Sequence, residues 1–251
     1  MFRFMEKPEL YNTILIEGLP GIGLVGKLAA EHMLDELHAT KFAELYSPNL
    51  PPQVSIKENG VIEPVKMDFY YYKRKDDTLV ILVGDFQGIT PESQYQISEK
   101  IINTMERFDV KRVYTLGGLG TGSLTKTPKV YGAATHPRLV KELKKYGVIF
   151  KGGGAIFGAS GLLLAISQLK GIEGVCLMGE THGQIIDARS AEAVLQVLTK
   201  IINQPLDMTK LEEKAKETEA QMAKISKMIA AYEATQKQQA EMVKDIPTYI
   251  R

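Results

Sequence analysis

The sequence has one cysteine, almost no net charge and no long hydrophobic run. With 31 Lys and Arg against 30 Asp and Glu, it has no overall basic field that would attract nucleic acid. Cys176 alone excludes an internal disulfide framework and is typical of a cytoplasmic protein. No apolar run reaches membrane-spanning length, and no cationic leader precedes a hydrophobic stretch. We therefore expect a protein that is soluble, not secreted and without contact with a membrane.

The sequence also lacks the patterns of metal sites and of hydrolase nucleophiles. Its four histidines are His32, His38, His136 and His182. They have no ligand spacing and no cysteine pairs beside them, so no metal site is expected. We also expect no cofactor. Residues 158–161 resemble the Gly-x-Ser-x-Gly elbow only in part. Cys176 lies in the apolar run 175–178, which favours a core residue over a nucleophile.

What the sequence does have is a glycine-rich stretch between residues 14 and 34, ILIEGLPGIGLVGKLAAEHML. Its first three residues are apolar, as in a buried strand, and apolar residues recur at helical spacing after Leu24. The stretch therefore predicts strand, turn and helix. We interpret its glycines as a structural turn that permits positive φ angles and close packing of helix on strand. They are Gly18, Gly21, Gly23 and Gly26.

Two nucleotide-binding motifs nearly match the same stretch. The phosphate-loop motif requires Ser or Thr after its lysine to hold magnesium, but Leu28 follows Lys27. The dinucleotide motif Gly-x-Gly-x-x-Gly fits residues 21–26, and Glu44 lies near the distance expected of a ribose-binding acid. Pro20, however, removes a backbone amide directly before the first glycine of that motif.

The rest of the first 204 residues alternates between apolar runs and amphipathic segments. This pattern predicts an α/β domain with a mostly parallel sheet and helices on both faces. Thr90 followed by Pro91 predicts a helix start, and Asp187 predicts another. Residues 69–72 and 79–83 predict a hairpin in which the first strand lies at the edge of the sheet.

Three predicted strands end in polar, glycine-rich loops at residues 84–88, 117–122 and 179–183. Ligands of open α/β sheets bind at the carboxyl ends of the strands. If the three ends are adjacent, one crevice is lined by Asp85, Gln87, Thr121, Glu180 and His182. Asp85, Glu180 and His182 are then the candidate catalytic residues of an enzyme, with an acid and an imidazole for proton transfer. The alternative is that these polar residues only close tight turns.

The composition changes after Pro205. Residues 211–243 contain no Pro or Gly, and apolar residues recur with coiled-coil spacing, Met222, Ile225 and Ile229 among them. We therefore predict a helical extension over residues 205–245 that packs in a homo-oligomer, folds back or projects. Residues 246–251 then form a free tail that contains Tyr249, Ile250 and Arg251.

Four runs of the sequence resemble the proteasome assembly chaperone family, second-subunit type, in its archaeal form. They are EGLPGIGLVGKLAAEHML from Glu17, YSPNLPP from Tyr46, VGDFQG from Val83 and LGGLGTG from Leu116. The resemblance covers about residues 8–205. It implies a nucleoside-phosphorylase-like α/β fold without established catalysis, and binding or assembly of proteasome α subunits. The tail is also similar to those of proteasome-binding activators, in which tyrosine is next to last, although Tyr249 is third from last.

Three hypotheses follow. The first is a non-enzymatic chaperone or activator that binds the proteasome core particle and aids its assembly or gate opening. The second is a nucleoside phosphorylase or nucleosidase that uses the strand-end crevice. The third is a dinucleotide-binding oxidoreductase. The resemblance favours the first, with Tyr249, Ile250 and Arg251 as its partner-binding residues.

Overall fold

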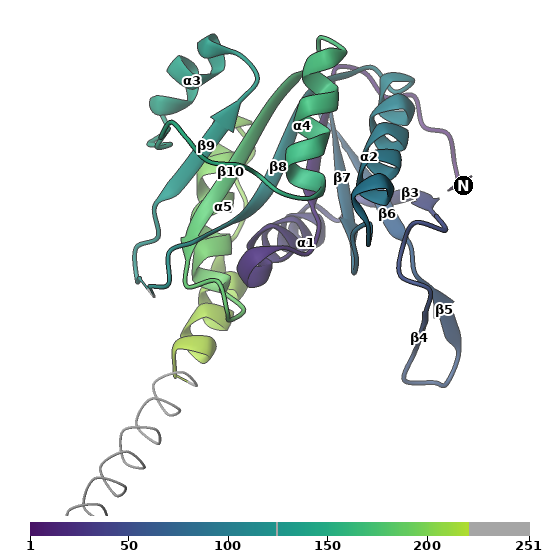
Figure 1. The fold of residues 1–251 in the computed structure, drawn as a ribbon, viewed down its shortest axis with the longest axis horizontal. Coiled ribbons are helices and arrows are strands. Elements are labelled where there is room, and N and C mark those ends of the chain that lie inside the picture. The colour runs from purple at the N-terminus through teal and green to yellow at the C-terminus, as the bar shows by residue number, and fades with distance from the viewer. Residues whose placement is uncertain (124, 221–251) are drawn as a thin grey trace, which may run out of the picture.

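The protein forms one eight-stranded sheet covered by helices on both faces (Figure 1). A computed structural model describes residues 1–123 and 125–220. The strands of the main sheet are β1 (Phe2–Phe4), β2 (Thr13–Gly18), β3 (Thr40–Leu45), β6 (Met67–Lys73), β7 (Thr78–Gly84), β8 (Val110–Gly120), β9 (Val130–Ala134) and β10 (Glu173–Thr181). The helices are α1 (Val25–Leu37), α2 (Pro91–Glu106), α3 (Pro137–Lys144), α4 (Ala159–Leu169) and α5 (Ala188–Ile201), with a short 3₁₀ turn at Ile22–Leu24.

The strand order is β1-β3-β6-β7-β2-β8-β10-β9. The four strands β7, β2, β8 and β10 run parallel to one another, while β1, β3, β6 and β9 join the sheet antiparallel to their neighbours. The predicted α/β class is thus confirmed. Because neighbouring parallel strands point the same way, the carboxyl ends of β7, β2, β8 and β10 meet at one edge of the sheet.

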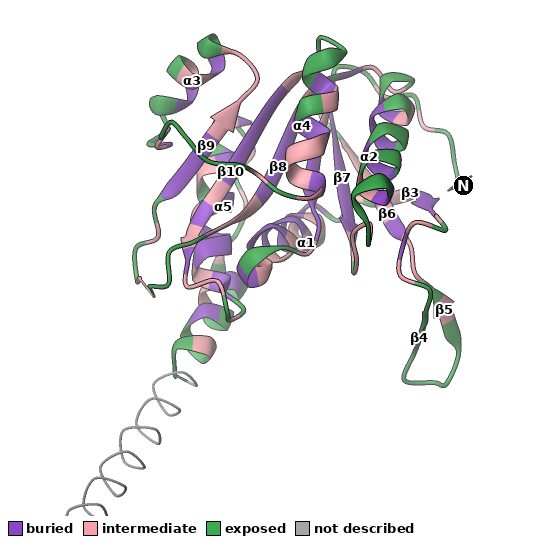
Figure 2. Cartoon of the chain, in the orientation of Figure 1, coloured by how far each residue is buried: buried purple, intermediate pink, exposed green. Residues whose placement is uncertain are grey.

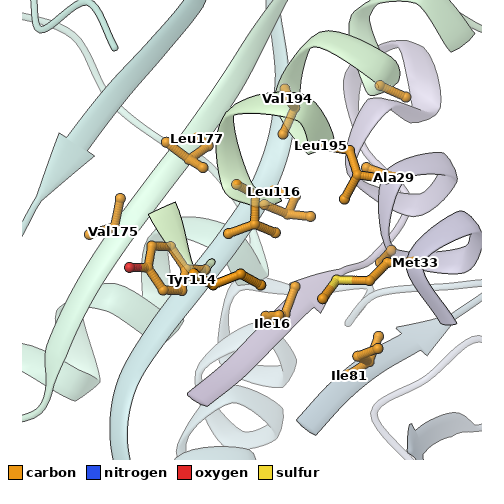
Figure 3. Packing of buried hydrophobic residues seen from close by; sticks show 14 of the residues in the cluster. Ile16, Ala29, Met33, Ile81, Tyr114, Leu116, Val175, Leu177, Val194 and Leu195 are labelled. Carbon is orange, nitrogen blue, oxygen red and sulfur yellow. The ribbon is translucent and has the colours of Figure 1, made fainter. Parts of the chain in front are cut away.

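Both faces of the central strands are buried, which explains their continuous apolar sequence. Ile16 in β2 faces a cluster that contains Ala29 and Met33 of α1 and Leu195 of α5 (Figure 3). Its neighbour Leu15 faces the opposite cluster, which α2 and α4 cover. Burying one Leu or Ile side chain stabilises the fold by roughly 1.5–3 kcal/mol. Each central strand therefore joins two hydrophobic cores.

Two predicted helix starts are confirmed. Thr90 Oγ1 accepts a hydrogen bond from the Ser93 amide at 3.1 Å, and the Ser93 side chain accepts one from the Thr90 amide. Asp187 Oδ1 accepts from the Ser190 amide at 2.9 Å. These side chains satisfy amides that a helix leaves free at its first turn.

Other expectations need correction. The loops predicted at residues 117–122 and 179–183 begin later than expected, because β8 continues through Gly120 and β10 through Thr181. Gly118 of β8 pairs with Gly179 of β10, so the pairing between the two strands keeps these glycines in the extended conformation. The strand over residues 67–73 is not at the edge, because β3 and then β1 add to it. The added strands come from distant parts of the sequence, where a local pattern gives no signal.

Two further segments are added to this layered body, of which one extends from it and the other packs against it. Strands β4 (Val54–Ile56) and β5 (Ile62–Pro64) form a separate hairpin that extends from it (Figure 1). Residues 209–220 are helical, and Leu211 and Ala215 are each only 1% exposed. Leu211 belongs to the core cluster under α1 and α5. The domain boundary predicted after residue 204 stays a prediction, and the described start of the following segment packs on the domain.

Candidate functional site

The glycine turn at the end of β2 brings three elements unusually close together. A Cβ atom on Gly26 would lie 2.0 Å from the carbonyl oxygen of Leu116 in β8, and one on Gly18 would lie 2.2 Å from Cβ of Ala30 in α1. Gly23 has φ of 64°, in the left-handed region that favours glycine. Gly21 has no atom within 4 Å of such a Cβ. The geometry supports a structural role at Gly18, Gly23 and Gly26, and gives no packing reason for glycine at Gly21.

The neighbouring strands do not supply a ribose-binding acid at Glu44. Strand β2 lies between β7 and β8, whereas Glu44 is in β3, which is separated from β2 by β6 and β7. β3 also runs antiparallel to its neighbour β6. In the dinucleotide-binding arrangement the acid ends a parallel strand beside the glycine turn. The position of Glu44 therefore does not support the oxidoreductase hypothesis.

The carboxyl edge of the sheet brings three of the predicted crevice residues together. Thr121 follows β8, and its amide donates to the carbonyl of Thr181 at the end of β10 at 2.8 Å. Glu180 is within β10, and its Oε2 accepts from the amide of Lys129 at 3.3 Å. His182 follows directly, and among the described residues its buried Nδ1 has no hydrogen-bond partner. These three residues thus lie at the neighbouring carboxyl ends of β8 and β10.

The other two crevice residues are held elsewhere. Asp85 follows β7, beyond β2 from the first group, and its carboxylate pairs with Lys27 of α1 at 2.8 Å. Gln87 donates to the carbonyl of Pro20 at 2.6 Å and accepts from the amide of Ala159 at 3.0 Å. Gln87 thus joins the loops before α1 and α4, and Asp85 faces α1. The five predicted residues do not converge on one substrate position.

The side of α1 that carries Lys27 borders a groove of about 490 Å³. α1, β6, the β4–β5 hairpin and the helix of residues 209–220 enclose it. Its charged lining contains five lysines and five acids: Lys27, Lys41, Lys66, Lys210, Lys214, Glu31, Asp35, Glu63, Asp68 and Asp85. We call it the charged groove. The equal numbers of the two signs leave its lining without a net formal charge.

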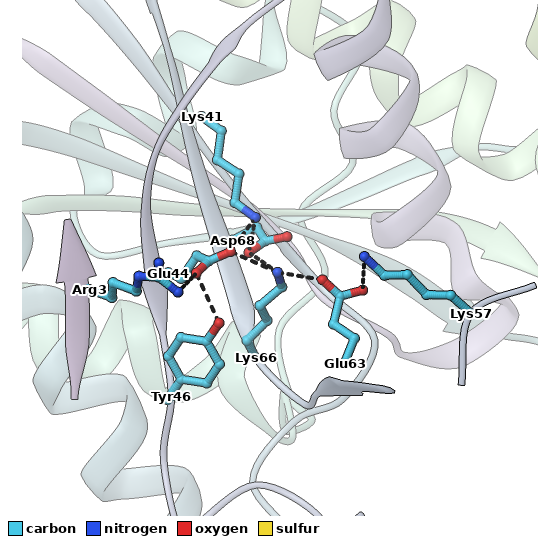
Figure 4. A network of polar contacts seen from close by, with 8 residues as sticks. All are labelled: Arg3, Lys41, Glu44, Tyr46, Lys57, Glu63, Lys66 and Asp68. Atoms are coloured by element: carbon cyan, nitrogen blue, oxygen red, sulfur yellow. Dashed lines mark hydrogen bonds and ion pairs between the residues drawn. The ribbon is translucent and has the colours of Figure 1, made fainter. Parts of the chain in front are cut away.

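The ion pairs on one wall of the charged groove centre on Glu44 (Figure 4). Lys41 and Lys66 each donate to its Oε1 at 2.7 Å, and the Tyr46 hydroxyl donates to its Oε2 at 2.9 Å. Burial alone would raise the pKa of Glu44, but these hydrogen bonds outweigh it and lower the pKa to about 2. Lys66 also pairs with Glu63 of β5 at 2.7 Å, so the same network attaches the hairpin to the sheet.

A second set of contacts attaches residues 207–220 to the domain. The His32 ring lies 2.6 Å from the carbonyl oxygen of Asp207, and the ring N–H donates to that oxygen. Lys210 pairs with Glu36 of α1 at 2.8 Å. Arg189 of α5 pairs with Glu219 at 3.1 Å. The direction in which the chain leaves the domain is therefore fixed by both α1 and α5.

Sequence reasoning missed the buried carboxyl group of Glu17. It is fully buried in β2, where its Oε2 accepts from the Ser160 hydroxyl and its Oε1 from the Leu19 amide, both at 3.0 Å. Burial raises the pKa of Glu17 to about 7, although these two hydrogen bonds lower it. The sequence signal that could have indicated this buried acid is its position directly after the apolar run 14–16 and before Gly18.

The remaining predicted features have the following outcomes. Tyr249, Ile250, Arg251 and the seam residues Met222, Ile225 and Ile229 lie outside the described residues. Among residues 1–123 and 125–220, no three His, Cys, Asp or Glu side chains are grouped to hold a metal ion. Within the same ranges, no helix is both long and apolar enough to cross a membrane. Cys176 is fully buried, and burial raises the pKa of its thiol to about 12.

Residues 15–226 match the PAC2 family. The chain belongs to the PAC2 family. The resemblance stated from the sequence is thereby confirmed. An uncharacterized protein from Methanocaldococcus jannaschii is 44% identical over 219 residues, which cover 87% of this chain and 84% of that protein. A second uncharacterized protein of the same organism is 31% identical over 250 residues, 99% of this chain and 98% of that protein.

Two solved structures from Pyrococcus furiosus are similar to this chain in fold as well as in sequence. Pyrococcus furiosus PbaB, described as an archaeal proteasome activator, is 42% identical with a TM-score of 0.85, over 90% of this chain and 98% of that one. P. furiosus PbaA, described as an archaeal homolog of proteasome-assembly chaperone, is 30% identical with a TM-score of 0.77. That alignment covers 96% of this chain and 98% of PbaA.

Proposed function

We propose that this protein is a non-enzymatic chaperone or activator that binds the proteasome core particle and aids its assembly or gate opening. The observation that carries the proposal is the 42% identity to an archaeal proteasome activator, with a TM-score of 0.85 over 90% of the chain. The similarity to PbaA points in the same direction.

The carboxyl edge of the sheet supports the non-enzymatic part of the proposal. A catalytic site needs an acid and a base within hydrogen-bond reach of one substrate atom. Here Asp85 is paired with Lys27. The side-chain amide of Gln87 makes two hydrogen bonds to backbone groups of neighbouring loops. Only Glu180 and His182, with Thr121, remain near one another. The nucleosidase hypothesis therefore retains two of its three candidate catalytic residues in one place.

We further propose the α subunits of the core particle as the direct partner, a homo-oligomer as the active form, and the cytoplasm as its location. Tyr249, Ile250 and Arg251 would provide the contact through a short apolar peptide ending in a carboxylate, which a cation on the partner can hold. A single tail binds weakly. An oligomer that presents several tails gains roughly a hundredfold or more by avidity.

The described start of the segment that leads to the tail supports this arrangement. His32 and Glu36 of α1 hold Asp207 and Lys210, and Arg189 of α5 holds Glu219. With Leu211 in the hydrophobic core, these contacts fix where the chain departs from each protomer. A fixed point of departure raises the effective concentration of a tail near its binding groove.

Retention of purified core particle on the immobilised full-length protein tests the proposal. Deletion of residues 248–251 should weaken retention at least tenfold without changing the melting temperature, and Tyr249→Ala should cause most of the loss. Thr248→Ala is the matched control and should retain the core particle like the parent. Equal retention by the parent and the deletion variant would remove the tail from the proposal. Failure of the parent to retain core particle would contradict the function itself.

The enzyme alternative is tested on the same preparations. The proposal predicts no release of free base from a panel of purine and pyrimidine nucleosides, with or without phosphate. Turnover that His182→Ala abolishes, with the melting temperature unchanged, would instead establish the nucleosidase or phosphorylase hypothesis.

A further inference from the structure

Helix α4 and the loop before it form an apolar surface with no charged side chain. Residues 152–169 read GGGAIFGASGLLLAISQL, and the nearest charges are Lys151 and Lys170 on either side. The inner face of α4 packs on β8 and β10 through residues such as Leu163, which is fully buried. At its two ends, Phe157 is 87% exposed and Leu169 is 88% exposed. Both ends of this helix thus place a large apolar side chain in solvent.

The neighbouring helix on the same face of the sheet is different. α2 also covers the sheet beside α4 (Figure 2), but its exposed positions include Glu92, Gln96, Glu99 and Lys100. This is the usual composition of a helix surface that faces water. Since α2 and α4 cover the same sheet, burial against the domain does not explain the apolar outer surface of α4.

An apolar groove of about 620 Å³ lies beside α4. Its walls are α4, the strands β9 and β10, and the glycine-rich loop 151–156. The side chains that line it are mostly small or apolar, including Ala133, Ala134, Leu164, Ala165 and Met178. Its volume is within the range of about 300–1,000 Å³ that is typical of pockets for small molecules, so it has room for an aromatic ring. Phe157 follows Ile156, which is itself part of the lining.

We propose that a second copy of this chain binds to this surface across a two-fold axis, with Phe157 of each copy in the α4–β9 groove of the other. The proposal rests on the homo-oligomer of the proposed function and names the surface that forms it. In a two-fold interface, each contact between residues i and j occurs twice. One protruding ring and one adjacent groove on the same chain are therefore sufficient for a self-complementary interface.

The chemistry of the surface favours a second copy over the core particle as the occupant. A different partner would have to provide both a pocket for Phe157 and an apolar group for the groove, whereas this chain already has both. Lys151 is the one charged residue that lines the groove among the described residues, and its ammonium lies over the Tyr131 ring, 5.1 Å from the ring centroid. Apolar surfaces of this kind are typical of homodimer interfaces, which are more hydrophobic than transient ones.

Self-association without any proteasome present tests the interface separately from the proposed function. By light scattering at increasing protein concentration, Phe157→Asp should shift the midpoint of self-association by at least tenfold, or reduce the mass of the largest species. Because Phe157 is 87% exposed on the single chain, the variant should fold like the parent, with an unchanged far-UV circular dichroism spectrum. Tyr95→Asp on α2 is the matched control, since Tyr95 is a 59% exposed ring over the same face of the sheet, and it should leave self-association unchanged.

A mixed cross-linking experiment tests the register. Phe157→Cys and Ala133→Cys proteins are prepared separately, mixed and oxidised. A disulfide requires Cβ atoms about 3.5–4.5 Å apart, so a covalent dimer should form in the mixture and not with Tyr95→Cys in place of Phe157→Cys. Native Cys176 gives no background because it is fully buried.

Three outcomes would overturn the interface. One is a parent protein that stays monomeric at all concentrations. Another is a Phe157→Asp variant that self-associates like the parent, together with no cross-link in the mixture. The third is a Phe157→Asp variant with unchanged mass that loses core particle on the affinity column, which would assign the surface to the core particle. Loss of self-association with core particle still retained would keep the interface and contradict only the oligomeric requirement of the proposed function.

Discussion

Glu17 and Glu44 are both nearly inaccessible to water, yet their surroundings act on them in opposite directions. Glu17 is fully buried under α4 with two neutral hydrogen-bond donors, and its pKa is raised to about 7. Glu44 is 6% exposed beside two lysines and a tyrosine, and its pKa is lowered to about 2. Burial alone therefore does not decide whether a carboxyl group is charged. The charge of its hydrogen-bond partners decides it.

The two groups also give the fold opposite responses to pH. The stability that Glu17 contributes is fully present below its unfolded pKa of about 4.5 and is lost as the pH rises through about 7. The stability that Glu44 contributes is present above about 4.5 and is lost as the pH falls through about 2. Three substitutions distinguish the pH dependence at Glu17 from that at Glu44. They follow in order of decreasing expected change in the free energy of unfolding.

Removing the Lys66 cation beside Glu44 should change the free energy of unfolding most. Lys66→Met leaves Glu44 with Lys41, the Tyr46 hydroxyl and a longer 3.9 Å pair to Arg3, and it deprives Glu63 of one partner. We expect the free energy of unfolding at pH 7 to fall by about 3 kcal/mol, because an incompletely paired carboxylate remains in a nearly buried position. Urea denaturation measures the change. The control is Lys57→Met, whose lysine is 52% exposed, and it should cost less than about 1 kcal/mol.

Removing the charge from the unpaired site should stabilise the protein, but only at high pH. Glu17→Gln eliminates the cost of ionising a buried carboxyl group, about 3 kcal/mol at pH 8, and loses about 1 kcal/mol because an amide oxygen replaces only one of two acceptors. We expect a net gain of about 2 kcal/mol at pH 8 and almost none at pH 5. Glu99→Gln on the exposed surface of α2 is the control. A gain that is equal at both pH values would show that Glu17 does not titrate between them.

Removing the side-chain hydrogen-bond donor to Glu17 should change the free energy of unfolding least. Ser160→Ala removes the 3.0 Å hydrogen bond to Oε2 and should cost about 1 kcal/mol at pH 8, where the carboxylate is charged. Ser167 on the same helix provides the control, since among the described residues its buried hydroxyl has no hydrogen-bond partner. Ser167→Ala should therefore be neutral or slightly stabilising in the same denaturation series.

The same pair of residues shows how far the sequence alone could predict this molecule. Local patterns sufficed for the strand before the glycine turn, for the caps at Thr90 and Asp187 and for the α/β class, because each depends on neighbours in the sequence. Pairing between distant segments left no local signal. The sequence distance of Glu44 from the glycine turn therefore fits a ribose-binding acid, although β3 lies outside β6 in the sheet, and the burial of Glu17 depends on α4.

The glycine-rich runs are a second case in which contacts between distant segments, and not the local sequence, decide the structure. Gly117 to Gly120 looked like a loop because glycine weakens a strand. A Cβ atom on Gly118 would lie 2.4 Å from the carbonyl oxygen of Ile22, so the close approach of the turn after β2 explains glycine inside this strand. The candidate crevice was only partly predictable for a related reason. The sequence placed its five residues at strand ends but gave no information on which side chains would be held by local hydrogen bonds.

The central place of β2 has a consequence for the synthesis of the protein. β2 is among the first strands to be made, but its two neighbours, β7 and β8, begin at Thr78 and Val110. At a translation rate of about 5–20 residues per second, roughly 3 to 12 seconds pass before even the nearer neighbour has emerged. During that interval the apolar residues of β2 have no partner strand in the sheet. A protein that we propose as an assembly factor thus itself passes through a stage in which its central strand is exposed to aggregation.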